Sequence, residues 1–83
     1  MLTSARSPYQ LGQIIREHRK ARGWTQSDLA QMTGMRQALL SEIETGHEGA
    51  KLGSIMSLLA ALELEIQVSS RHSGSAADIA DIF

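Results

Sequence analysis

Apolar residues recur along this chain first with a helical period and then, near its end, with a period of two. The helical pattern covers four stretches, namely residues 8–22, 26–32, 36–45 and 52–62. Ser7 and Pro8 precede the first stretch, and these residue types are favoured at the N-cap and at the first position of a helix. The sequence therefore predicts a mainly α bundle of four to five short helices.

The period of two covers residues 62–69, where Leu62, Leu64, Ile66 and Val68 alternate with polar residues. This alternation predicts a short strand with one apolar face. A single strand cannot satisfy its own backbone hydrogen bonds, and no other segment of the chain has this period. We therefore expect the strands of two copies to pair across a two-fold axis, which would make these four residues the contact of a homodimer. An amphipathic helical extension or a loose arm is the alternative.

Residues 26–43 have the spacing of a helix-turn-helix. Ala30 is small enough for the steep crossing of two short helices, and Gly34 accepts the positive φ that the turn requires. The apolar residues expected to face inward are Leu29, Met35, Leu40 and Ile43. The opposite face of the second helix is then free to enter a DNA major groove.

The residues before this motif also indicate where helices begin and end. Thr25 with Asp28 approximates a capping box at the start of the second helix. Gly23 fits the end of the first helix, and Trp24 is expected to fill the core between the two.

Composition limits the function. The chain has 83 residues, enough for one domain, and no cysteine, which excludes disulfides and thiolate metal sites. Its three histidines share no ligand spacing, and no nucleophile arrangement or phosphate-binding glycine loop occurs, so we expect no metal, no cofactor and no enzyme activity. No apolar run is long enough to cross a membrane and no signal-peptide pattern is present, so we expect no membrane association and a cytoplasmic location.

The net charge of −1 conceals a split along the chain. Residues 1–36 hold six basic and two acidic side chains, whereas residues 37–83 hold two basic and seven acidic ones. One half facing phosphates and the other facing a protein would produce this asymmetry. The alternative is an ordinary solvated surface of mixed charge.

The start of the second motif helix carries the candidate base readers. Arg36 can bond bidentately to guanine and Gln37 to adenine, while Ala38 can touch a thymine methyl group and Ser41 can bond to a base or a phosphate. Gln26 and Ser27, at the start of the preceding helix, are placed for phosphate contacts.

Arg19 and Glu44 have a different expected role. We expect their side chains to pair and so to join the first helix to the end of the third. A buried pair of this kind stabilises the fold rather than contacting DNA.

Residues 23–30, 34–38 and 43–44 resemble the Xre/Cro (lambda-repressor-like) type of helix-turn-helix and, more narrowly, the HipB antitoxin family; the resemblance covers residues 7–69. It implies a dimer whose C-terminal strands form a two-stranded sheet, binding to palindromic double-stranded operators and autorepression. It also implies a complex with a HipA-type Ser/Thr kinase toxin, as in type II toxin–antitoxin systems. Two positions depart from the family pattern, since His18 stands where leucine is usual and Leu39 where a small polar residue is common.

These features divide the chain into a lead-in (1–7), a DNA-binding domain with its dimerisation strand (8–69, strand 62–69) and a flexible acidic tail (70–83). Two other functions remain open at this point. One is a stand-alone Xre-family repressor without a toxin. The other is a protein-interaction module that has lost DNA binding.

Overall fold

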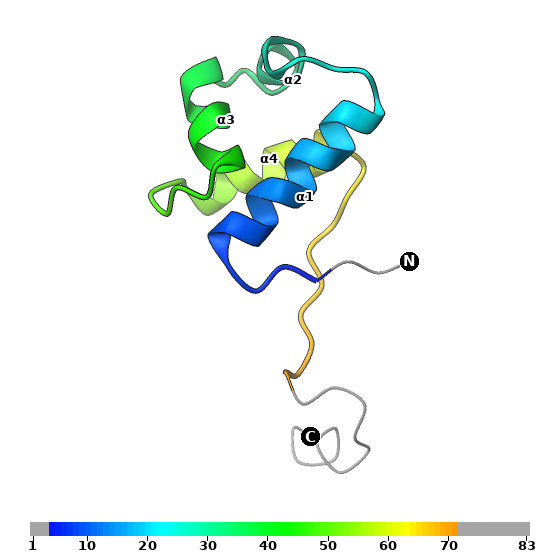
Figure 1. Ribbon diagram of the computed structural model, residues 1–83, viewed down its shortest axis with the longest axis vertical. Coiled ribbons are helices and arrows are strands. Elements are labelled where there is room, and N and C mark those ends of the chain that lie inside the picture. Colours follow the sequence, from blue (N-terminus) through cyan, green and yellow to red (C-terminus); the bar gives the residue numbers. More distant parts are fainter. Residues whose placement is uncertain (1–3, 72–83) are drawn as a thin grey trace.

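The computed structural model describes residues 4–71, which form four helices joined by short connections (Figure 1). The helices are α1 (Pro8–Ala21), α2 (Gln26–Thr33), α3 (Gln37–Glu44) and α4 (Leu52–Ala61). They match the four predicted ranges closely, and no fifth helix occurs between residues 4 and 71. The mainly α fold is therefore confirmed.

The ends of α1 and α2 are fixed by the capping residues that the sequence predicts. Ser7 is the N-cap of α1 and accepts a hydrogen bond from the Gln10 N–H at 3.1 Å. At α2 the capping box is complete, because Thr25 Oγ1 accepts from the Asp28 N–H at 3.0 Å and Asp28 Oδ2 accepts from the Thr25 N–H at 2.8 Å. Gly34 ends α2 with a φ of 67°, which is the left-handed geometry expected of the turn.

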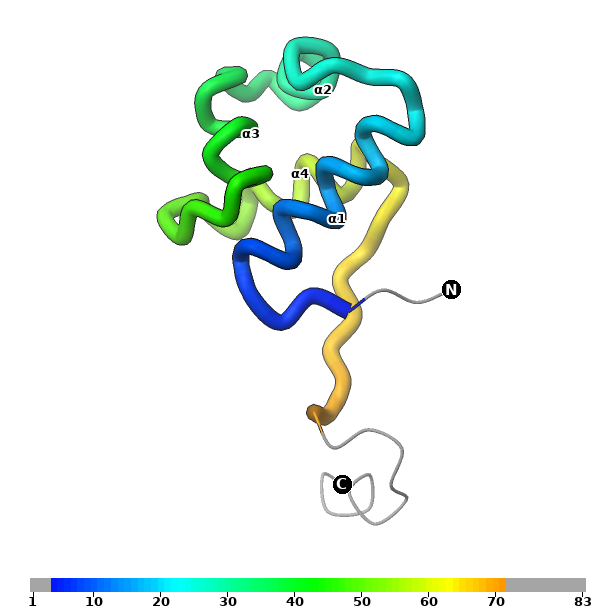
Figure 2. Tube along the Cα trace, viewed as in Figure 1, coloured from blue at the N-terminus to red at the C-terminus, as the bar shows by residue number. Residues whose placement is uncertain are grey.

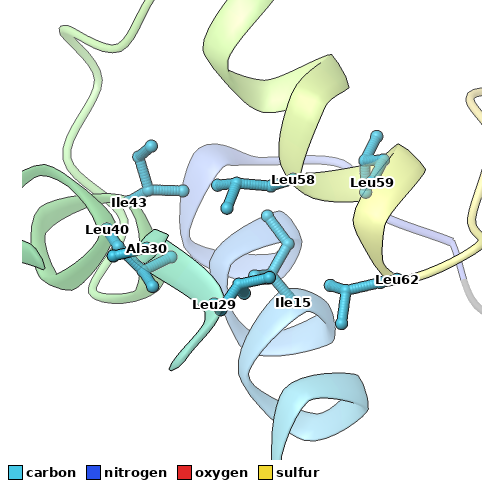
Figure 3. Close-up of a cluster of buried hydrophobic side chains, with 8 residues drawn as sticks. All are labelled: Ile15, Leu29, Ala30, Leu40, Ile43, Leu58, Leu59 and Leu62. Atoms are coloured by element: carbon cyan, nitrogen blue, oxygen red, sulfur yellow. The ribbon is translucent and has the colours of Figure 1, made fainter. Parts of the chain in front are cut away.

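One apolar cluster holds the four helices together (Figure 3). Its buried members are Ile15, Leu29, Ala30, Leu40, Ile43, Leu58, Leu59 and Leu62. α1 packs on α3, and α2 packs on both α3 and α4. Met35 and Trp24 are only half-buried and lie against this cluster, so the expectation that Trp24 fills the core holds in part.

The predicted strand over residues 62–69 needs correction at its start. Leu62 follows the last residue of α4, is 0% exposed and belongs to the core of a single chain, so its side chain is already buried before a second copy is present. Leu64 is half-buried against the same core. Leu62 lies four residues after Leu58, so it continues the buried stripe of α4, and the alternation hid this because both periods place an apolar residue at 62.

Residues 64–71, here named the C-terminal arm, leave the helices as an extended segment (yellow to orange in Figure 2). Ile66 is 47% exposed and Val68 is 95% exposed. Residues 4–71 of one chain contain no strand. A single chain offers the C-terminal arm no second strand for its backbone hydrogen bonds, so the predicted strand would need a second copy. Most of the predicted acidic tail, residues 72–83, lies outside the described residues.

α1 and α3 approach each other so closely at Gly12 that no side chain fits there. A methyl group on Gly12 would overlap the carbonyl oxygen of Ile43 and lie 2.8 Å from the carbonyl oxygen of Glu44. We expect Gly12→Ala to lower the free energy of unfolding by about 1–3 kcal/mol, because two helices must move apart. Urea denaturation measures this loss. Gly53→Ala in α4 is the control, since nothing lies within 4 Å of the added methyl group, and equal stability losses in the two variants would contradict the close approach.

Candidate nucleic-acid interface

The start of α3 is open and exposed. Arg36 is its N-cap residue, with extended backbone (φ −71°, ψ 140°), and no side chain caps this helix end. Arg36, Gln37 and Ala38 are all exposed. The first-turn N–H groups, the positive end of the helix dipole and three free side chains therefore meet at one place.

In the next turn of α3, some side chains are partly exposed and others lie in the core. Ser41 is half-buried, and its carbonyl oxygen accepts a hydrogen bond from Thr45 Oγ1 at 3.0 Å. Leu39 is half-buried against the core and Leu40 is fully buried. Four sequence-predicted readers thus lie on α3 or at its N-cap, three of them exposed and Ser41 less accessible.

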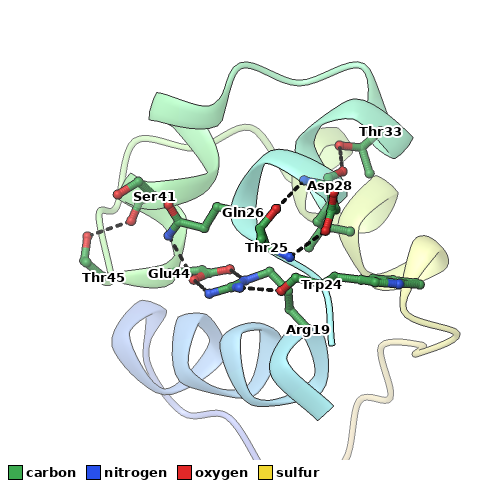
Figure 4. Close-up of polar contacts among 10 residues, drawn as sticks. Arg19, Trp24, Thr25, Gln26, Asp28, Thr33, Ser41, Glu44 and Thr45 are labelled. Atoms are coloured by element: carbon green, nitrogen blue, oxygen red, sulfur yellow. Dashed lines mark hydrogen bonds and ion pairs between the residues drawn. The ribbon is translucent and has the colours of Figure 1, made fainter. Parts of the chain in front are cut away.

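The two residues predicted for phosphate contacts differ in their exposure and in their hydrogen bonds. Ser27 is exposed in the first turn of α2. Gln26 is half-buried, and its side-chain Nε2 donates to Glu44 Oε1 at 3.1 Å (Figure 4). Its amide keeps a second N–H and an acceptor oxygen, so this bond does not exhaust it. Gln26 therefore joins the start of α2 to the end of α3, a role that the sequence did not indicate.

Arg19 and Glu44, predicted as a pair, lie in contact across α1 and α3. Arg19 Nε donates to Glu44 Oε2 at 2.7 Å and Arg19 Nη2 donates to Glu44 Oε1 at 3.0 Å, which is a bidentate pair (Figure 4). Arg19 Nη1 donates to the Trp24 carbonyl oxygen at 2.7 Å. Both side chains are buried, and among the described residues no buried side-chain polar atom lacks a partner. This network fixes α1, the start of α2 and the end of α3 relative to one another.

Two of the basic residues in the first half of the chain are engaged in contacts within the fold. Arg19 is neutralised inside the fold by Glu44. Arg22 lies over the Trp24 ring, 5.6 Å from its centroid, and donates to a backbone carbonyl oxygen. The simple excess of charge in residues 1–36 thus overstates what a ligand can reach, and Arg36 is the cation at the start of α3.

The described part of the chain contains neither a candidate metal site nor a membrane-spanning helix. Between residues 4 and 71 no three His, Asp or Glu side chains are grouped so that they could hold a metal ion. No helix in that range is long and apolar enough to span a membrane.

The comparisons with known proteins agree with this geometry. Residues 15–68 match the helix-turn-helix family. Antitoxin HipB of Escherichia coli K12 is 33% identical over 69 residues, which cover 83% of this chain and 78% of HipB. The chain belongs to the HipB-like helix-turn-helix proteins.

Solved structures of HipB have the same fold as this HipB-like chain. A complex of HipB with an O2 20mer has a TM-score of 0.78 at 30% identity, covering 86% of this chain and 99% of that one. The complex of HipA, HipB, O2 and O3 gives a TM-score of 0.77 at 31% identity, covering 84% and 99%. The resemblance stated from the sequence is therefore confirmed. The individual contact residues of the HipB-like chain stay predictions.

Proposed function

We propose that this chain is a sequence-specific DNA-binding antitoxin that represses its own operon. The observation that carries the proposal is the open start of α3, where Arg36, Gln37 and Ala38 stand exposed on a helix-turn-helix frame. The similarity to HipB, which is known in complexes with O2 and with HipA, supports it.

In the proposed complex, the start of α3 enters the major groove. Arg36 donates two hydrogen bonds to the O6 and N7 atoms of a guanine, and Gln37 pairs with an adenine through its amide. Ala38 contacts a thymine methyl group, and Ser41 bonds to a base or a phosphate once the groove covers it. The Arg19–Glu44 network keeps α3 at a fixed angle, so the backbone of the helix does not have to be reordered when it enters the groove.

Phosphate contacts set the position of the protein on the duplex. Ser27 and the two backbone N–H groups that the capping box leaves free at the start of α2 bind one phosphate, and Gln26 adds a contact with its remaining amide atoms. Binding to DNA from upstream of the gene should therefore weaken steeply as salt is raised, because each neutralised phosphate releases counterions.

The palindromic operator requires two copies of the chain. In the proposed homodimer the C-terminal arms pair through their backbones, with Leu64, Ile66 and Val68 on the apolar side and Leu62 left in the core of each chain. Ile66 and Val68 are exposed in one chain, which supports an unsatisfied contact there.

The proposed protein partner is a HipA-type Ser/Thr kinase toxin. Its support is the HipA–HipB complex among the similar structures. An operator-binding protein works where the DNA is, so the proposed location is the bacterial cytoplasm, and we propose no enzymatic activity of its own.

Arg36→Ala tests the reading helix. We expect the variant to lose about 1–3 kcal/mol of binding free energy for DNA from upstream of the gene and to relax specificity at one base pair, because a bidentate base contact disappears. Titrations by fluorescence anisotropy at two salt concentrations, with random DNA alongside, measure both effects. Arg16→Ala is the control, an exposed arginine on the outside of α1 that removes the same charge.

Two results would contradict the proposal in different ways. Equal affinity of Arg36→Ala and Arg16→Ala would show that α3 does not read the bases through Arg36. Equal, weak binding of the unaltered chain to upstream and random DNA would point instead to a protein-interaction module without operator specificity.

A further inference from the structure

All four helices end in the same backbone arrangement. At each end, one residue with positive φ donates its N–H to the carbonyl oxygen three residues back, and the next residue donates to the carbonyl oxygen five residues back. In α1, α2 and α3 the residue with positive φ is a glycine, namely Gly23, Gly34 and Gly46. In α4 it is Glu63.

Glu63 occupies a conformation that costs free energy for any residue with a Cβ atom. Its φ is 59°, and it is the one non-glycine residue between residues 4 and 71 with a positive φ. The turn is nevertheless complete, because Glu63 N donates to the Ala60 oxygen at 3.0 Å and Leu64 N donates to the Leu59 oxygen at 2.7 Å. Some other contact must therefore offset the cost of the left-handed residue.

Arg22, one residue after α1, makes that contact. Its Nη2 donates to the carbonyl oxygen of Leu62 at 2.6 Å, in the residue directly before Glu63. The guanidinium group is held in place by the Trp24 ring and by a bond from Nη1 to the His18 carbonyl oxygen at 3.4 Å. The Glu63 carboxylate lies 3.8 Å from Nη2 but is 87% exposed, so the bond to the carbonyl oxygen is the stronger of the two contacts.

We propose that Arg22 is a positioning residue for the C-terminal arm: by binding the Leu62 carbonyl oxygen it holds Glu63 in the left-handed conformation and so fixes the direction in which residues 64–71 leave α4. Arg22 thereby ties the end of α1, in the DNA-binding half, to the start of the arm. The consequence for pairing of two arms rests on the proposed homodimer, whereas the consequence for the turn itself holds in a single chain.

Amide hydrogen exchange of the full chain, followed by NMR, tests the turn directly. In Arg22→Met, which keeps an apolar side chain beside Trp24 but loses both donors, we expect the Leu64 N–H to exchange about tenfold faster, since a charged donor is lost from a part-buried bond. The Leu40 N–H in α3 reports global opening and separates a local effect from general destabilisation. Arg16→Met, which removes the same charge from an exposed position of α1, should leave the Leu64 rate unchanged.

A second variant separates the turn from the packing on Trp24. Glycine adopts the left-handed conformation without strain, so in a Glu63→Gly background the addition of Arg22→Met should change the Leu64 exchange rate by less than about threefold. If Arg22 acted only through Trp24, the two substitutions would act independently, Arg22→Met would speed the exchange about tenfold in that background as well, and the proposal would be wrong. The same Leu64 rate in Arg22→Met and Arg16→Met would also overturn it.

Sedimentation equilibrium of the same variants tests whether the contact between Arg22 and the Leu62 carbonyl oxygen also affects dimerisation. The dimer dissociation constant should rise in Arg22→Met, and the double variant should have the same constant as Glu63→Gly alone. If the unaltered chain is monomeric at every concentration, the proposed homodimer fails, while the exchange rates still decide the role of Arg22.

Discussion

Glu44→Ala is expected to cost about 3–5 kcal/mol of stability, because it leaves the Arg19 guanidinium buried without its counter-charge. Gln26 loses its acceptor in the same step, so α1, α2 and α3 all lose a link. Small domains are stable by only about 5–15 kcal/mol in total, so the expected loss is a large fraction of the free energy of unfolding. The midpoint of urea denaturation, followed by circular dichroism, measures the loss.

Glu42→Ala is the matched control for this prediction. Glu42 is an exposed glutamate on the same helix, two residues earlier, and its removal should change the stability by no more than about 0.5 kcal/mol. A double variant, Arg19→Met with Glu44→Leu, should recover much of the loss, because no unpaired charge is then buried. Equal midpoints for Glu44→Ala and Glu42→Ala would show that the pair contributes nothing to stability.

Leu62→Ala is expected to lower the free energy of unfolding by about 2–5 kcal/mol, since it opens a cavity at a fully buried position of the core. The loss should not depend on protein concentration, because Leu62 packs within one chain. Denaturation at several concentrations therefore distinguishes this placement from the dimer contact that the alternating sequence indicates.

Leu52→Ala is the control, with the same exchange of side chains at the first residue of α4, where leucine is 65% exposed. We expect a loss well below that of Leu62→Ala. If the loss in Leu62→Ala grows on dilution while the change in Leu52→Ala stays small, Leu62 contributes to the contact between copies after all.

The positions where sequence reasoning succeeded are those governed by local chemistry. Ser7, Thr25 with Asp28, and Gly34 bond to backbone within a few residues, so their types and spacing are enough to place the helix ends. The inward residues Leu29, Leu40 and Ile43 follow from helical period alone. The Arg19–Glu44 pair joins positions far apart in the chain. Its prediction relied on the expected arrangement of the helices in a helix-turn-helix domain, which places the first helix beside the end of the third.

The candidate interface could be predicted to a lesser degree. The position of Arg36 and Gln37 follows from the motif, because the second helix of a helix-turn-helix begins there. The bond from Gln26 to Glu44 could not be read from the sequence, since a glutamine at a helix start serves a phosphate or a neighbouring carboxylate equally well. Only the distance between the two side chains in the folded chain decides between these partners.

The sequence by itself determined the four helices, the N-caps of α1 and α2, the turn, the family and the start of the reading helix, because these depend on residue period and on contacts within one or two turns. The tertiary structure alone decided that Leu62 lies in the core, that Gly12 is a point of backbone contact and that Arg22 reaches the carbonyl oxygen of Leu62. Each of these depends on how two helices distant in the chain approach each other, and that approach is fixed by packing of the whole core rather than by any local pattern.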